Sequence, residues 1–130
     1  MLEHVENPVE IIQQCIEWLK PGGRIIAATP NANSLHRQLA VISGLISNVH
    51  ELTSTDISIG HRRVVNPQQL SSYFIDSRLL IECFGGYYLK SFSNMQIEQI
   101  TNKEVQKSLM VLGEKYFNIA ADIYVVATRI

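Results

Sequence analysis

Histidine and glutamate residues in two parts of the chain are the residue types best suited to moving a proton at neutral pH. Glu3 and His4 are adjacent near the N-terminus, whereas His61 lies in a polar stretch and is followed by two arginines. An imidazole titrates near neutral pH and can accept a proton from a hydroxyl. We therefore predict His4 and His61 as candidate catalytic residues. Arg62 and Arg63 are candidate substrate-binding residues, because a guanidinium can hold an anionic group through two parallel hydrogen bonds.

Each of these candidates also has a structural interpretation. His4 would line a cleft or be hydrogen-bonded beneath it. The segment 61–63 would belong to a solvated loop that salt bridges to Glu51 and Asp56 hold in place. The residue types alone leave both interpretations open.

A second group of polar residues is associated with a predicted strand and its surroundings. Asn31 directly follows the strand, and His36 comes shortly after it. Both are candidate substrate-binding residues, whereas surface solvation explains Arg37. Tyr87 is a further candidate, because it would line a substrate pocket together with its neighbours Tyr88 and Lys90. Aromatic residues and a lysine on an edge strand are the alternative.

The elements that must position these residues begin with a well-marked helix. Asn7 can cap it, Pro8 suits its first position, and apolar residues recur at helical spacing up to Leu19. Residues 21–23, Pro-Gly-Gly, end the helix. The strand at residues 24–29 follows, and its continuous apolar run predicts a strand covered on both faces.

Similar signals divide the rest of the chain into alternating helices and strands. The sequence predicts helices over residues 35–44, 67–77 and 101–113, strands over 79–84 and 121–128, a turn at Gly85-Gly86, and an irregular loop over 47–66. No linker or repeat interrupts the chain. We therefore expect a single α/β domain over residues 1–130.

The composition limits the partners that we expect. The chain has 130 residues, of which 46% are apolar and 18% charged, and its net charge is −1. Nucleic-acid partners are not expected, because they favour a basic excess. No apolar run approaches the roughly 20 residues of a membrane span, and no signal peptide is recognisable, so we expect a cytoplasmic protein. Cys15 and Cys83 are expected to be buried thiols, and Trp18 to pack inside.

Several short motifs together resemble a known enzyme family. They are Leu-Glu-His-Val at 2–5, Asn-Pro at 7–8, Leu-Lys-Pro-Gly-Gly at 19–23 and Pro-Asn at 30–31. In this order they resemble class I S-adenosylmethionine (SAM)-dependent methyltransferases, in particular the branch that includes ubiquinone-biosynthesis O-methyltransferases. The resemblance is strongest over residues 2–34 and weakens after residue 91. It implies the later strands and helices of a Rossmann-like methyltransferase sheet, which dimerisation or a partner would complete.

The resemblance also implies roles for individual residues. Leu2, Glu3 and His4 would lie beyond the family's fourth strand and border the cofactor SAM. The strand at 24–29 would be the fifth, and its end would open onto the cleft for a small-molecule acceptor. Some relatives bind a divalent metal with a Glu-x-x-Glu-His set, of which Glu3 and His4 would be the last two ligands. Because the first ligand would precede Met1, we expect no metal.

The resemblance implies that two parts of the cofactor site would lie upstream of Met1. These are the glycine-rich loop and the acidic residue for the ribose hydroxyls, and the chain contains no G-x-G. We therefore expect the C-terminal part of a methyltransferase, truncated or split and inactive alone, that contributes the acceptor side of the cleft. The alternatives are a non-catalytic remnant that acts as a dimerisation or binding module, and a regulator of a full-length enzyme. The expected partner is a second copy or the missing N-terminal half.

Overall fold

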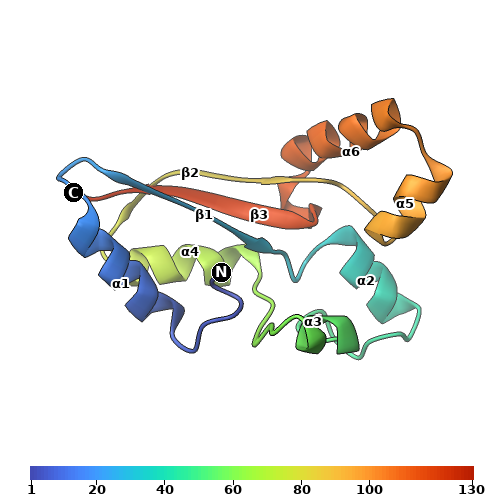
Figure 1. Cartoon of the computed structure of the whole chain (residues 1–130), viewed down its shortest axis with the longest axis horizontal. Coiled ribbons are helices and arrows are strands. Elements are labelled where there is room, and N and C mark those ends of the chain that lie inside the picture. Colours follow the sequence, from blue (N-terminus) through green and yellow to red (C-terminus); the bar gives the residue numbers. More distant parts are fainter.

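A three-stranded sheet forms the centre of the computed structural model, which describes residues 1–130 (Figure 1). The strands are β1 (Arg24–Pro30), β2 (Leu80–Tyr87) and β3 (Asp122–Thr128), in the order β1-β3-β2. The central strand β3 is antiparallel to both neighbours. It follows that β1 and β2 run in the same direction without pairing with each other, as they would in a doubly wound sheet into which a final strand has been inserted.

Six α-helices and one short 3₁₀ helix surround this sheet. They are α1 (Pro8–Trp18), α2 (Leu35–Ile42), α3 (Ser54–Ser58), α4 (Pro67–Asp76), α5 (Asn94–Ile100), α6 (Lys103–Lys115) and η1 (Phe117–Ile119). In Figure 1, α1 and α4 lie along one face of the sheet, whereas α2, α3, α5 and α6 gather at the end where β1 and β2 finish. None of the helices combines the length and the apolarity needed to cross a membrane.

The predicted starts of two helices, α1 and α4, are confirmed by their capping bonds. The side chain of Asn7 accepts a hydrogen bond from the amide of Glu10, and that of Asn66 accepts one from Gln69. A proline occupies the first turn in both cases, where its missing N–H costs nothing. These local signals fix where α1 and α4 begin.

The hydrophobic core lies between these two helices and the sheet. Leu70 and Phe74 of α4 are fully buried, and they belong to one cluster with Ile123 and Val125 of β3. Leu2 is also part of this cluster, at 4% exposure. The segment before α1 is thereby anchored to the sheet.

The opposite face of the sheet is largely uncovered, which corrects the prediction that β1 is buried on both faces. Ile26 is 72% exposed and Leu80 is 57% exposed. Cys83 is exposed and unpaired, so the prediction of a buried thiol there was wrong, whereas Cys15 is half-buried and also free. Trp18 is 79% exposed at the end of α1, contrary to the packing role expected for it.

Three other predictions about elements were wrong. Gly85 and Gly86 lie within β2 rather than in a turn, because the ring of Tyr124 on β3 occupies the space that a side chain at Gly85 would fill. The stretch 47–66 contains the short helix α3, which Thr53 and Asp56 start with a capping box. The last helix continues past Gly113 to Lys115, and α5 was not predicted.

Candidate functional site

The segment before α1 is tied to the stretch before α4 by backbone and arginine hydrogen bonds. The amide of Arg62 donates to the carbonyl of Glu3 at 2.8 Å. The guanidinium of Arg63 donates to the carbonyls of Leu2, Val5 and Glu6. Because these bonds hold the two segments together, His61 lies beside Glu3 and His4.

The resulting cluster contains one carboxylate and two imidazoles, and we call Glu3, His4 and His61 the Glu-His-His cluster. From Oε1 of Glu3 the distance is 3.5 Å to Nε2 of His4 and 4.0 Å to Nε2 of His61. The two rings meet edge to face, with centroids 4.8 Å apart. The Glu3 and His61 side chains are only 12% and 9% exposed, and that of His4 is 43% exposed. The cluster is therefore open to solvent on the His4 side.

Hydrogen bonds on the outer side of each ring assign the histidine tautomers. Nδ1 of His4 lies 3.1 Å from the carbonyl of Gly60, and Nδ1 of His61 lies 3.1 Å from Oδ1 of Asp56. A carbonyl and a carboxylate accept only, so each Nδ1 carries the hydrogen and donates it. In the neutral rings both Nε2 lone pairs therefore face Glu3. This arrangement suits a proton or a cation between the three groups.

The same three groups are able to hold a divalent metal ion. Their ligand atoms all lie within 4.8 Å of one another. Imidazole nitrogen and carboxylate oxygen are common metal ligands, and a histidine ligand usually donates its other N–H to a fixed acceptor, as both rings do here. His61, which lies far from Glu3 and His4 in the sequence, takes the place that the sequence analysis assigned to an upstream glutamate.

Asp56 orients His61 and is itself held by two other residues. Its carboxylate accepts hydrogen bonds from the amide and the hydroxyl of Thr53, both at 2.9 Å, and pairs with Arg37 at 3.3 Å. Burial alone would raise the pKa of Asp56, but the bonds from Thr53 and His61 and the charge of Arg37 outweigh it and lower this pKa. Asp56 thus stays charged opposite His61.

Arg37 is buried rather than solvated, which corrects the expectation for that residue. It is 8% exposed, and its guanidinium also donates to the carbonyls of Val49 and Glu51. These bonds connect α2 to the loop before α3. Sequence reasoning identified Asp56 only as a salt-bridge partner, because neither its pairing with His61 nor that with Arg37 has a local sequence signal.

Two of the candidate substrate-binding residues are fully engaged inside the chain. Asn31 is buried, and its amide donates to the carbonyls of Asn118 and Ala120 while its oxygen accepts from the amide of Asn33. The guanidinium of Arg63 is engaged by the segment before α1, as described above. In this structure both residues hold segments together.

The other candidates lie around the site. Arg62 is exposed beside the Glu-His-His cluster. Tyr87 pairs with Asp122 across the sheet, and burial together with the charges of Asp122 and Glu3 raises its pKa. The Leu2 side chain is in the core and does not join Glu3 and His4 at the cluster.

His36 lines the largest hollow in the molecule, of about 770 Å³, between α2, α3 and the segment before α5. Its Nδ1 is buried without a hydrogen-bond partner. Burial and the positive charges of Lys90 and Arg37 lower the pKa of His36 to about 4. His36 is therefore a neutral imidazole at physiological pH. Asp56 also lines this hollow, and because it is hydrogen-bonded to His61, the hollow and the Glu-His-His cluster are neighbours.

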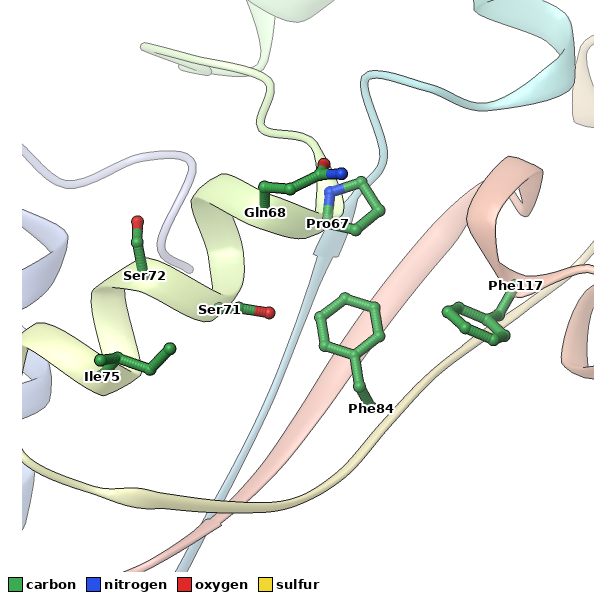
Figure 2. Close-up of a pocket in the computed structure, with 7 residues that line it drawn as sticks. All are labelled: Pro67, Gln68, Ser71, Ser72, Ile75, Phe84 and Phe117. Carbon is green, nitrogen blue, oxygen red and sulfur yellow. The ribbon is translucent and has the colours of Figure 1, made fainter.

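A smaller hollow, of about 340 Å³, lies between α4 and the edge of β2 (Figure 2). Figure 2 shows the rings of Phe84 and Phe117 on one side and Gln68 and Ser71 of α4 across from them. The two ring centroids are 5.9 Å apart. No ionisable side chain lines this hollow, so it offers no group for proton transfer.

Comparisons of sequence with curated proteins find methyltransferases. Ubiquinone biosynthesis O-methyltransferase of Vibrio cholerae is 28% identical over 96 residues, which cover 72% of this chain and 37% of that protein. The enzyme of the same name from Xanthomonas oryzae pv. oryzae is 28% identical over 97 residues. The one from Pectobacterium carotovorum is 43% identical over 42 residues. No family model matches the chain.

Comparisons of structure agree with this result. The chain matches a SAM-dependent methyltransferase from Mesorhizobium loti with a TM-score of 0.59 and 16% identity, over 98% of this chain and 57% of that one. It matches another from Archaeoglobus fulgidus with a TM-score of 0.55 and 17% identity. The predicted resemblance and the predicted partial methyltransferase fold are both confirmed. The chain spans 37% of the length of its V. cholerae relative.

Proposed function

We propose that this chain forms the acceptor side of the active site in a SAM-dependent methyltransferase that acts on a small molecule. The observation that carries the proposal is the Glu-His-His cluster. By the family resemblance, the cofactor and the acceptor would meet beside it. Its solvent-accessible member is His4, whose Nε2 lies 3.5 Å from Glu3.

The chain's residues would border the methyl donor rather than hold it. The sequence has no G-x-G, and Leu2 uses its side chain in the core and its carbonyl in a bond to Arg63. Bound SAM supplies an electrophilic methyl group on its sulfonium sulfur. The remaining donor contacts would come from a partner or from another part of a longer protein.

The chain's own residues would remove a proton from the acceptor. When an acceptor hydroxyl lies near Nε2 of His4, this nitrogen can take the proton while Nδ1 keeps its bond to Gly60. Glu3 stabilises the imidazolium that forms, because its carboxylate lies 3.5 Å away. The carboxylate of Asp56, 3.1 Å from Nδ1 of His61, would likewise stabilise a positive charge on the His61 ring. Glu3, His4 and His61 would also be the residues to hold a divalent ion, which would supply Lewis-acid activation of the acceptor hydroxyl.

A complementation experiment tests this proposal. The full chain is mixed with the N-terminal part of the V. cholerae relative, and methyl transfer to that enzyme's own substrate is measured with radiolabelled SAM. We expect transfer by the mixture and none by either part alone. His4→Gln should lower the rate of the mixture at least tenfold, whereas His50→Gln, outside the cluster, should not.

Binding of SAM by the chain alone would contradict the proposal that the donor contacts come from elsewhere. Isothermal titration should show no saturable binding of SAM by the isolated chain, because the donor contacts are supplied elsewhere. Micromolar binding by a monomer would contradict the proposed division of the site.

A second candidate function is a non-catalytic module that dimerises with a copy of itself or binds a full-length methyltransferase. The uncovered face of the sheet, with Ile26 and Leu80 exposed, favours it. A stable dimer that neither binds SAM nor complements the relative would support this candidate over the enzyme.

A further inference from the structure

The 770 Å³ hollow beside α2 contains a lysine with no acidic partner. Lys90 is half-buried, and none of the ion pairs in the structure includes it. Its ammonium donates one hydrogen bond, to Oδ1 of Asn94 at 2.7 Å. An ammonium has three N–H donors, so two are left for a ligand.

The other charged groups around the hollow do not neutralise Lys90. Arg37 and Asp56 both line it, but they pair with each other at 3.3 Å. Asp122 is close enough to raise the pKa of Lys90, yet burial prevails and lowers it. Burial likewise raises the pKa of Asp122. Among the charged residues that line the hollow, Lys90 is therefore the one without an oppositely charged partner at ion-pair distance.

His36 lines the hollow together with Lys90. The positive charge of Lys90 helps to keep the His36 ring neutral, and Nδ1 of this ring has no hydrogen-bond partner within the chain. A neutral imidazole can donate one hydrogen bond from this nitrogen. Lys90 and His36 thus supply an ammonium and an imidazole to the wall of the same hollow.

The rest of the lining is apolar and accessible. Leu39 and Leu45 come from the α2 side, and Phe92 and Met95 from the α5 side. These four side chains are between 41% and 78% exposed. A lining of large apolar side chains with a small number of polar groups is typical of sites that bind small molecules.

We propose that this hollow binds a small apolar molecule with one carboxylate, which Lys90 and His36 hold while the four apolar side chains cover its hydrocarbon part. The proposal concerns binding alone, so it goes beyond the proposed function and holds whether or not the chain takes part in methyl transfer.

Titration calorimetry of the full chain with octanoate, below its micelle concentration, tests the proposal. We expect one site, with octanol bound at least tenfold more weakly because it lacks the charge, and octylammonium not bound. Lys90→Met should raise the dissociation constant of octanoate at least tenfold, and Lys90→Arg much less. Lys107→Met, a lysine exposed on α6, is the matched control and should leave binding unchanged.

Equal affinity for octanoate and octanol, or unchanged affinity in a folded Lys90→Met variant, would overturn the proposal. So would co-sedimentation with phosphatidylglycerol vesicles without any binding of monomeric octanoate, which would identify the hollow's apolar rim as a membrane contact. On titration with octanoate, backbone amide shifts should change in the segments 36–45, 53–56 and 90–96, which line the hollow, and changes confined to other residues would also contradict the proposal.

Discussion

At the scale of single residues, the candidate site depends on which ring nitrogen of each histidine carries its hydrogen. His4 and His61 both use Nδ1 as a donor, to Gly60 and Asp56, and both turn Nε2 toward Glu3. The sequence identified the two histidines and the glutamate as candidates, but not that they meet. Their contact depends on Arg62 and Arg63, which bind the segment before α1 from far along the chain.

Replacing Asp56 by Asn should allow the neutral His61 ring to populate both of its tautomers. The asparagine keeps an oxygen for the amide of Thr53, so α3 should still start at the same place. It removes the charge that fixes Nδ1–H, so ¹⁵N shifts of the His61 ring should change from one tautomer to a mixture. Asp76→Asn, at the end of α4, is the control. An unchanged His61 tautomer in Asp56→Asn would show that another group sets it.

His36 should make the stability of the chain fall with pH in a defined range. Its pKa is about 4 in the folded chain and 6.5 as the reference value, so between these values the unfolded state binds the proton and the folded state does not. Stability is therefore retained above pH 6.5 and lost as the pH falls toward 4, by at most about 1.4 kcal/mol per pH unit. When the free energy of unfolding is measured with urea at several pH values, it should depend less steeply on pH in His36→Phe than in the unchanged chain. An equal dependence on pH in both proteins would show that His36 is not the group that titrates in this range.

At the scale of elements, capping signals predicted where helices begin more reliably than apolar patterns predicted which strand faces are buried. Asn7 and Asn66 act on amides three residues away, so a local sequence contains all that is needed. The burial of Cys83 depends instead on what covers the sheet, and the conformation at Gly85 depends on Tyr124 of another strand. Such information is not local, and there the predictions failed.

The contact between α6 and the end of β2 requires glycine at position 113. Gly113 is buried, and a Cβ there would collide with the backbone of Tyr87 and Tyr88. In an exposed helix, Gly→Ala normally stabilises by about 1 kcal/mol. Here Gly113→Ala should instead destabilise by about 1–3 kcal/mol in urea unfolding. Ser108→Ala on the exposed side of α6 is the control, and stabilisation by Gly113→Ala would show that α6 can move away.

At the scale of the whole molecule, one face of the sheet is packed and the other is not. The central strand β3 turns Ile123, Val125 and Ala127 toward the core under α1 and α4, whereas Ile26 of β1 and Leu80 of β2 are exposed. The sequence predicted the architecture of the packed side, because that side is built by neighbouring elements of this chain. It predicted that β1 would be covered on both faces, and this was wrong because the second cover is not formed by residues 1–130.

The exposed face should make the chain self-associate. We expect a concentration-dependent increase of mass in sedimentation velocity at micromolar concentrations, and Ile26→Lys should shift the chain toward monomer. Ile75→Lys is the control, because Ile75 is 62% exposed on α4, away from this face. Monomer at all concentrations, or equal effects of both variants, would contradict this prediction.

The position of β3 in the sheet affects the order in which the chain can fold during synthesis. β1 and β2 each form sheet hydrogen bonds only with β3, and β3 is the last of the three strands to be made. Within residues 1–130, neither of the earlier strands can form hydrogen bonds to β3 until residues 122–128 have been synthesised. The pairing of these three strands is therefore completed only after the last of them has been made, although the helices between them can form earlier from local signals.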